Sequence, residues 1–263
     1  MLAEDLQKYA PGISLVILTD RPRDFEQLPN VSAFAHRLQS VKGYHDKRFV
    51  LEKALKEFES CVFVDADIRI LGPIPRLLPF SPGLVARYGC GIIKHNFTDK
   101  ARAAFSPIQT TAKALSLNLE TVFWFHELMF LFSKQQGRET AFFNHWQTIA
   151  REFEINGVYE GEGNVMGLAA AASGLNINFH RQDFFPCFKD NIQKEKIKNG
   201  QANPQAMARE FRIHREIEYP ERSLVQKAAN RMQTKAGFYN RLAALRIKAY
   251  LSRQAGFAPH PPK

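Results

Sequence analysis

Cys61-Val62-Phe63-Val64-Asp65-Ala66-Asp67 decides the fold prediction, because a run of apolar residues ends directly in two acidic ones. Four consecutive apolar residues predict a buried strand. Asp65 and Asp67 are therefore expected where this strand leaves its sheet. Two carboxylates at positions i and i+2 can hold one hard divalent cation, and the cation can hold a diphosphate. An acidic turn after a core strand, with no ligand, is the alternative interpretation.

Helical and extended segments alternate along the chain around this strand. Apolar spacing and terminating Gly or Pro residues predict these helices: 2–9, 45–58, 99–116, 138–154 and 164–173. Apolar runs predict these strands: 14–19, 61–64, 84–88, 123–132 and 175–179. This alternation favours an α/β sandwich with a mostly parallel sheet.

The composition is that of a folded protein with a large core. The chain has 263 residues, of which 45% are hydrophobic, and this excludes a disordered protein. It lacks a run of 18 apolar residues, so no spanning helix is expected, and its first residues lack the pattern of a secretory signal. Three widely spaced cysteines (Cys61, Cys90 and Cys187) fit reduced thiols in a cytoplasmic protein better than a disulfide framework.

The basic charge is concentrated at the C-terminal end. The formal net charge is +10, and the chain from Arg222 onward contains nine Lys or Arg and no Asp or Glu. Residues 221–254 are expected to form a basic helical tail, because their apolar residues recur at helical spacing. These apolar residues include Phe238, Leu242, Leu245 and Ala249. Such a helix suits peripheral contact with an anionic membrane; the alternative is a helix that packs on the domain. Residues 255–263 contain three prolines and are expected to be disordered.

The helix that precedes the acidic strand adds a second motif. The segment Lys47–Leu55, followed by Val62–Asp67, resembles the GT-A class of glycosyltransferases, and most nearly the retaining galactosyl- and glucosyltransferases of families 8 and 6. Family 8 enzymes carry an Arg on this helix, spaced from the first Asp much as Arg48 is from Asp65. The resemblance implies that Arg48 contacts the donor sugar or its diphosphate. A solvated helix arginine is the alternative.

The resemblance also implies the fold and the reaction. Residues 1–220 are expected to form a GT-A-like αβα sandwich. The chain opens with a helix where the family has its first strand, so that strand is expected to be missing, through a late start or a different mode of donor binding. The activity implied is transfer of a hexose from a nucleotide sugar, expected to be a UDP-sugar, to an unidentified carbohydrate, lipid-linked or protein acceptor. Retention of configuration is implied in the same way.

A divalent cation, Mn²⁺ or Mg²⁺, is implied as the cofactor, and it needs a third protein ligand beside Asp65 and Asp67. Family 8 supplies a late His after Ile, and Ile213-His214 stands in the corresponding place. The family's following Gly and Lys-Pro-Trp are absent, and Arg215 follows instead. His214 is therefore the candidate ligand and His180 the second candidate, with a lone surface His as the alternative.

A second acidic segment, Glu160-Gly161-Glu162-Gly163-Asn164, precedes an apolar helix. Glycines beside acids let the backbone approach a ligand closely. The resemblance implies that Glu162 or Glu160 binds donor hydroxyls or stabilises an oxocarbenium-like transition state. An acidic cap at a helix N-terminus is the alternative. His126-Glu127, a polar pair within an aromatic segment, either lines the acceptor pocket or is satisfied inside the core.

Three other functions compete with a transferase. A haloacid-dehalogenase-like phosphatase also has a strand followed by two Asp, but it wants Thr or Val where this chain has Arg69. A non-enzymatic module that binds nucleic acid or membrane would use the basic tail and leave the acidic segments unexplained, so nucleic acid is not the expected partner. A degenerate transferase would keep the fold and lose turnover.

Overall fold

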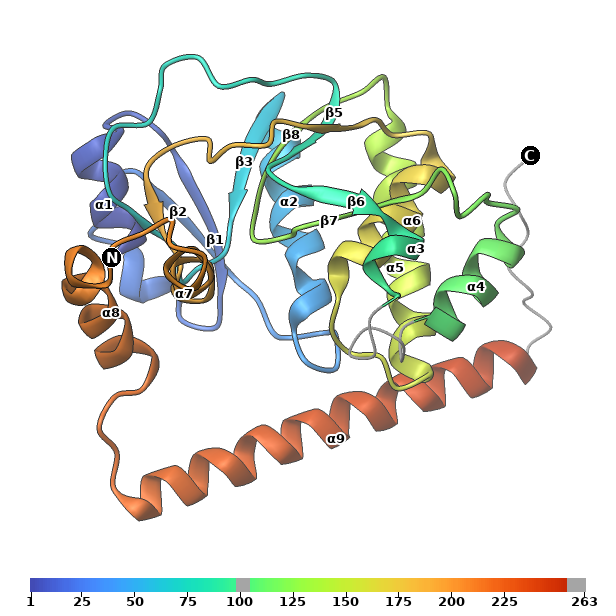
Figure 1. Cartoon of the computed structure of the whole chain (residues 1–263). Helices are drawn as coiled ribbons and strands as arrows, with labels where there is room; N and C mark the ends of the chain where they lie inside the picture. Colours follow the sequence, from blue (N-terminus) through green and yellow to red (C-terminus); the bar gives the residue numbers. More distant parts are fainter. Residues whose placement is uncertain (98–104, 255–263) are drawn as a thin grey trace.

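Helices and strands alternate in the computed structural model, which describes residues 1–97 and 105–254 (Figure 1). The first half contains α1 (Leu2–Tyr9), β1 (Leu15–Thr19), η1 (Pro22–Phe25), β2 (Val31–Ala35), η2 (Tyr44–Asp46), α2 (Lys47–Glu57), β3 (Ser60–Val64), β4 (Arg69–Ile70), β5 (Gly83–Ala86), β6 (Gly89–Gly91), α3 (Ile92–His95) and α4 (Phe105–Ala114). The second half contains β7 (Phe123–Phe125), β8 (Met129–Ser133), α5 (Arg138–Ile155), α6 (Glu162–Ser173), β9 (Ile177–Phe179), β10 (Cys187–Phe188), α7 (Asp190–Lys198), α8 (Pro204–Glu218) and α9 (Leu224–Gln254). The prediction of an α/β fold is confirmed.

The central sheet has the strand order β3-β8-β5-β9. Strand β8 is antiparallel to both of its neighbours, whereas β5 and β9 are parallel. Three strands therefore run in one direction and β8 runs against them. The prediction of a mostly parallel sheet is wrong for the pairings of this sheet, because β8 enters between β3 and β5 from the opposite end. Strands β1 and β2 form a separate parallel pair.

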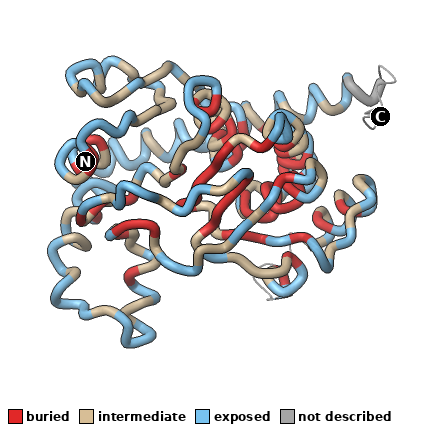
Figure 2. The backbone as a smooth tube through the Cα atoms, turned by 90° about the horizontal axis from the view of Figure 1, so that it is seen from above, coloured by how far each residue is buried: buried red, intermediate tan, exposed pale blue. Residues whose placement is uncertain are grey.

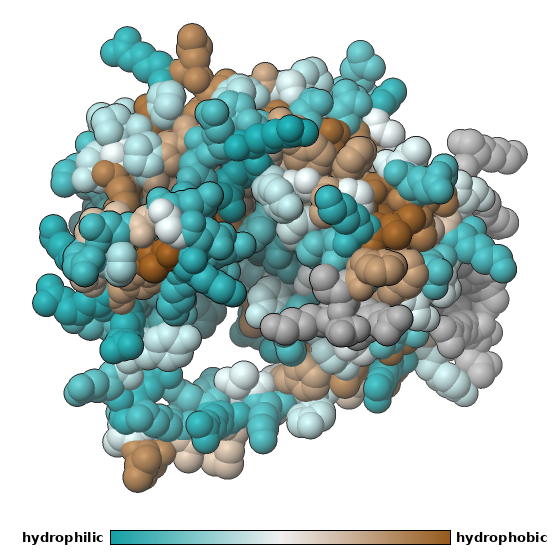
Figure 3. All heavy atoms as spheres, viewed as in Figure 1, coloured by the Kyte–Doolittle hydropathy of each residue, from teal (hydrophilic) through white to brown (hydrophobic). Residues whose placement is uncertain are grey.

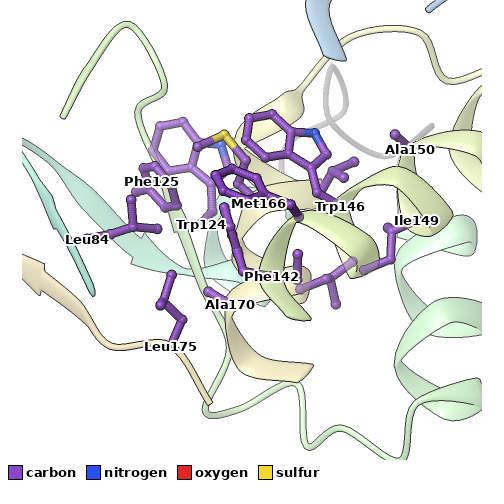
Figure 4. Packing of buried hydrophobic residues seen from close by; sticks show 14 of the residues in the cluster. Leu84, Trp124, Phe125, Phe142, Trp146, Ile149, Ala150, Met166, Ala170 and Leu175 are labelled. Atoms are coloured by element: carbon purple, nitrogen blue, oxygen red, sulfur yellow. The ribbon is translucent and has the colours of Figure 1, made fainter. Parts of the chain in front are cut away.

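Apolar side chains leave the sheet on both faces, as the buried strands require. Phe63, Phe130 and Phe132 belong to a core shared with α2, α5 and α6. Met129 and Leu131 belong to a second core with α1 and the segment before β10. Buried segments accordingly gather in the middle of the molecule (Figure 2), and rings from β7 and α5 pack there beside Met166 and Ala170 of α6 (Figure 4). The sheet is thus covered on both sides.

The predicted strand at residues 123–132 is two strands, β7 and β8, interrupted at residues 126–128. The prediction of one strand is wrong because His126 bonds elsewhere: its N–H donates to the carbonyl of Tyr88, 2.9 Å away. Helix α6 packs closely on β7. A Cβ atom at Gly163 or Gly167 would collide with carbonyl oxygens of β7, so these two glycines permit the close approach.

Two predictions fall partly or wholly outside the described residues. Helix α4 begins at Phe105, so the first part of the predicted helix at 99–116 is not described, and neither is the tail end at 255–263. The basic segment forms the single long helix α9. In the part of the chain that the structure describes, no helix is both long and apolar enough to cross a membrane.

Candidate functional site

The acidic pair lies where it was predicted, at the carboxyl end of β3. The Asp65 N–H donates to the carbonyl of Leu128 (2.9 Å), and the Ile68 N–H donates to the carbonyl of Asp65 (3.1 Å). The first bond continues the β3–β8 pairing, and the second closes a turn that presents both carboxylates. The geometry of this turn is thus set by the strand on each side of it.

Arg69 links the acidic turn to helices α1 and α8. Its guanidinium donates two hydrogen bonds to the Asp5 carboxylate of α1, at 2.6 and 2.9 Å, and one to Glu210 of α8 at 3.2 Å. A two-point bond between a guanidinium and a carboxylate fixes orientation as well as distance. Arg69 therefore holds the acidic turn against α8, the helix that carries His214.

Two lysines neutralise the acidic pair. Lys47, at the start of α2, places its ammonium nitrogen 2.8 Å from Asp65 Oδ1 and 2.6 Å from Glu162 Oε1. Lys189, just before α7, forms an ion pair with Asp67 and lies 3.7 Å from Asp65 Oδ2. Lys47 thus bridges two carboxylates from segments far apart in the sequence, whereas Lys189 bridges the two carboxylates of the acidic pair itself.

Burial and charge act in opposite directions on these groups. Burial by itself would lower the pKa of Lys47, but the carboxylates of Glu162 and Asp65 outweigh it and raise the pKa above the ordinary lysine value. For Asp65 the balance is reversed: burial raises its pKa more than Lys47 and Lys189 lower it. The lysine is therefore charged at every physiological pH.

Glu162 is the first residue of α6 and is buried, with 3% of its surface exposed. Gly161 precedes it with a left-handed φ of +81°, which turns the chain into the helix. Glu160 lies outside the helix, is exposed, and pairs with Lys42 at 2.6 Å. Of the two predicted glutamates, Glu162 is therefore the one that joins the acidic pair through Lys47.

These groups surround a cavity of about 230 Å³. The charged and polar residues that line it come from five parts of the chain: Tyr44, Lys47, Asp65, His126, Glu127, Glu160, Glu162, Lys189 and Asn191. Such a concentration of acids and bases in one cavity is typical of a site that binds or transforms a polar ligand.

Glu127 is the least satisfied group in the cavity. Burial, followed by the nearby Glu162 carboxylate, raises the pKa of Glu127 to about 7. Its Oε2 atom is buried and has no hydrogen-bond partner among the described residues, and the same holds for His126 Nδ1. Burial and the charge of Arg87 lower the pKa of His126 to about 4, so this ring is neutral at pH 7. A neutral imidazole beside a partly protonated acid can exchange protons or hydrogen bonds with a ligand.

A possible metal-ligand group lies beside the cavity. Asp67, His214 and Glu218 each offer one ligand atom, and these atoms lie within 4.8 Å of one another. His214 Nε2 is 4.0 Å from Asp67 Oδ2 and 3.9 Å from Glu218 Oε1. His214 is buried, and within the described residues its Nε2 atom lacks a hydrogen-bond partner. A cation between these three atoms would satisfy that nitrogen, so the residues fit a divalent metal.

The remaining predicted residues point elsewhere. The Arg48 guanidinium pairs with Glu52 and lies 4.1 Å from the centre of the Phe49 ring, along α2 rather than toward Asp65. His180, the second candidate ligand, stacks on Phe184, with 5.4 Å between ring centres. The structure brings Asp65, Asp67, Glu162 and His214 together in one site. Arg48 and His180 do not take part in the contacts of this site.

Sequence reasoning missed three residues of the site, Lys47, Lys189 and Glu218, and it named Glu127 without placing it beside Glu162. Lys47 and Arg48 differ by one position, which is about 100° around a helix, and sequence alone does not show which one faces the strand. Glu127 had a usable signal. If residues 129–133 pair antiparallel with β3, the residues just before them lie beside Asp65.

The arrangement suits an anionic, metal-chelating ligand with a polar body. Four carboxyl groups, two ammonium groups and one imidazole line the cavity, and burial raises the pKa of two of the carboxyls, Asp65 and Glu127. Neither the protein-family models nor the curated proteins compared with this chain match it. The function is therefore argued from the site alone.

Proposed function

We propose that the protein is a metal-dependent glycosyltransferase that moves a hexose from a nucleotide sugar, and that its α/β domain is GT-A-like. One observation carries the proposal: carboxylates from the end of β3, the β7–β8 turn and the start of α6 converge with Lys47 and Lys189 on one cavity. Nucleotide sugars present a diphosphate beside a polyhydroxylated ring, which calls for cations at one end of a site and hydrogen-bonding acids at the other.

The metal, Mn²⁺ or Mg²⁺, would be held by Asp67 and His214, with Glu218 or Asp65 completing the set. His214 supplies the orphaned buried nitrogen, and the carboxylates supply the hard oxygen ligands that such cations prefer. When bound, the cation neutralises the charge of the diphosphate leaving group. Lys189 pairs with Asp67, and with a cation held by Asp67 the Lys189 ammonium group would be free to bind a phosphate oxygen of the donor.

Glu127 and Glu162 are assigned to the sugar. Lys47 holds Glu162 in place at 2.6 Å, so the Glu162 carboxyl group can accept hydrogen bonds from hydroxyls or stabilise positive charge at the anomeric carbon. Glu127 has a pKa of about 7 and carries a proton for much of the time at neutral pH. A carboxyl group with a raised pKa beside a second acid is the pairing that glycosyl chemistry uses. Retention of configuration rests on the family resemblance.

A degenerate transferase without turnover is the second candidate, and one observation favours it. Lys47 and Lys189 already neutralise the carboxylates, so the site is stable without a cation. In such a protein the lysines would keep the acids occupied, and a nucleotide sugar would bind weakly and remain uncleaved.

The test is a panel of nucleotide sugars with and without Mn²⁺, read by thermal shift and by release of the nucleoside diphosphate. We expect UDP and Mn²⁺ together to raise the melting temperature, and Asp67→Asn to abolish this shift. Asp20→Asn is the matched control, because Asp20 is an exposed acid that follows β1 as Asp65 follows β3. Binding without release would support the degenerate protein, and the absence of any Mn²⁺-dependent binding would overturn both candidates.

A further inference from the structure

Helix α9 carries two separate apolar faces, and one of them is already used. Phe238 packs edge-on against Tyr159, with 5.2 Å between ring centres, and Leu242 is buried. Arg241 donates a hydrogen bond to the carbonyl of Val41 at 3.0 Å. The apolar face predicted from the sequence, which also includes Leu245 and Ala249, is thus the face that binds α9 to the domain.

A second apolar face lies open along the same helix. Its residues follow one another at steps of four and three, and we call them the outer seam: Val225, Ala229, Met232, Ala236, Tyr239, Ala243 and Ile247. Residues at this spacing share one side of a helix. All seven are exposed, and the larger ones keep much of their surface in water: 78% for Val225, 69% for Met232 and 60% for Ile247. Isolated exposed apolar residues are ordinary, but a seam that continues for six turns indicates a partner.

The position of α9 leaves this seam accessible. The first half of the helix stands away from the domain, and Figure 3 shows an open gap between the two. Among the described residues, the contacts that hold α9 to the domain lie around Phe238, Arg241 and Leu242. A flat or extended surface can therefore approach the helix along its length.

The charge of the helix decides which partner fits. Lys235 stands three positions after Met232 and Arg246 three after Ala243, so both lie beside the outer seam, and α9 contains no Asp or Glu. Two copies of this helix packed side by side would bring like charges together without a compensating acid, which opposes a dimer through this face. An anionic surface would instead gain from every one of these charges.

We propose that α9 lies on an anionic lipid surface, with the outer seam in the boundary between headgroups and acyl chains. Apolar residues on one side of a helix and Lys or Arg beside them are the features of helices that lie in the membrane plane. The long basic side chains can keep their charged ends among the lipid phosphates while their methylene groups cover apolar surface. Attraction of this kind grows with each Lys or Arg and weakens in salt.

The experiment is co-sedimentation of the full chain with vesicles of phosphatidylcholine, either alone or mixed with phosphatidylglycerol, at low and high salt. We expect binding to the anionic vesicles at low salt and little to the neutral ones. The variant Met232→Ser, Ile247→Ser should reduce the partition coefficient by roughly tenfold or more, because it removes two apolar groups from the buried side. The variant Gln233→Ser, Ala244→Ser changes two exposed residues of α9 outside the seam, and it should bind like the wild type.

Circular dichroism of all variants checks that α9 remains helical, and the control carries the same number of serines as the seam variant. Equal binding of the wild type and the seam variant to anionic vesicles would overturn the proposal. So would a concentration-dependent dimer that the seam variant abolishes, because the seam would then cover a second copy. Retention of an oligonucleotide with no binding to vesicles would assign the charge to nucleic acid and overturn it as well. None of these outcomes depends on whether the cavity binds a nucleotide sugar.

Discussion

The cavity at the end of β3 and the helix α9 use charge in opposite ways. In the cavity, Lys47 and Lys189 come from different segments and each meets two carboxylates. In α9 the basic residues stand among apolar ones, and the helix itself supplies no acid. The charges of Lys47 and Lys189 are therefore matched by acids of the chain, whereas α9 offers its exposed basic residues no acid of its own.

This difference follows from the cost of burying charge. A buried ionic group without a partner is expensive, so the fold has to bring the opposite charge to it. An exposed ammonium group is solvated by water and needs no partner in the chain. Substitutions in the two regions should consequently differ in their effect on the free energy of unfolding, and the predictions below test that contrast.

The largest effect is expected from Lys47→Met. This change leaves the half-buried Asp65 and the buried Glu162 without the ammonium group that they share, and removing one member of a buried ionic group costs about 3–5 kcal/mol. The loss of free energy of unfolding should be smaller at pH 5 than at pH 8, because at pH 5 the carboxyl groups left without Lys47 can take up protons. Urea unfolding at both pH values measures it. Lys53→Met, a more exposed position on the same helix, is the control and should change the free energy of unfolding by less than about 0.5 kcal/mol.

Gly167→Ala should also destabilise the protein, by roughly 3 kcal/mol, because the new Cβ would collide with the carbonyl of Phe123 and push α6 away from β7. Gly91→Ala is the control, since a Cβ atom there meets no other atom within 4 Å. Thermal unfolding of both variants measures the difference. Equal melting temperatures would mean that the close packing of α6 does not position Glu162.

A smaller effect is expected at the junction of the two regions. Glu154 of α5 accepts a hydrogen bond from the Val41 N–H at 2.7 Å, and Arg241 of α9 donates to the Val41 carbonyl. Burial raises the pKa of Glu154 from 4.5 to about 7, although the bond from Val41 opposes the shift. Between these two values the folded state holds a proton that the unfolded state has lost, so this group makes stability fall as the pH rises from about 4.5 to 7.

Glu154→Gln should remove that contribution while keeping an acceptor for the Val41 N–H. The wild type should lose roughly 1–2 kcal/mol more than the variant between pH 5 and pH 8. Urea unfolding across this range measures the two slopes, and other titrating groups cancel in the comparison. Parallel slopes would show that Glu154 is ionised in the folded protein throughout.

The smallest effect is expected from Lys235→Gln on α9. The side chain is exposed, so the free energy of unfolding should change by less than about 0.5 kcal/mol. Urea unfolding beside Lys47→Met gives the direct contrast between a solvated and a buried lysine. A loss as large as that of Lys47→Met would show that α9 charges stabilise the domain and are not available to a surface.

Sequence patterns alone determined the α/β class, the helices that became α1, α2, α5 and α6, and the position of Asp65 and Asp67 at the end of β3. These features depend on local spacing. A run of apolar residues predicts a buried strand, and the first carboxylates after the run mark the point where the strand leaves the sheet. The charge of the C-terminal segment was equally visible, because it needs only a count of residues.

Tertiary structure decided the pairings. The direction of β8, the choice of Lys47 rather than Arg48, and the meeting of Glu127 with Glu162 all depend on segments that are distant in the sequence. Local pattern does not record which of two adjacent residues faces inward, since a step of one position turns a helix by about 100°. The same holds for α9: the sequence showed an apolar face, and only the packed structure showed that the domain covers this face and leaves the outer seam open.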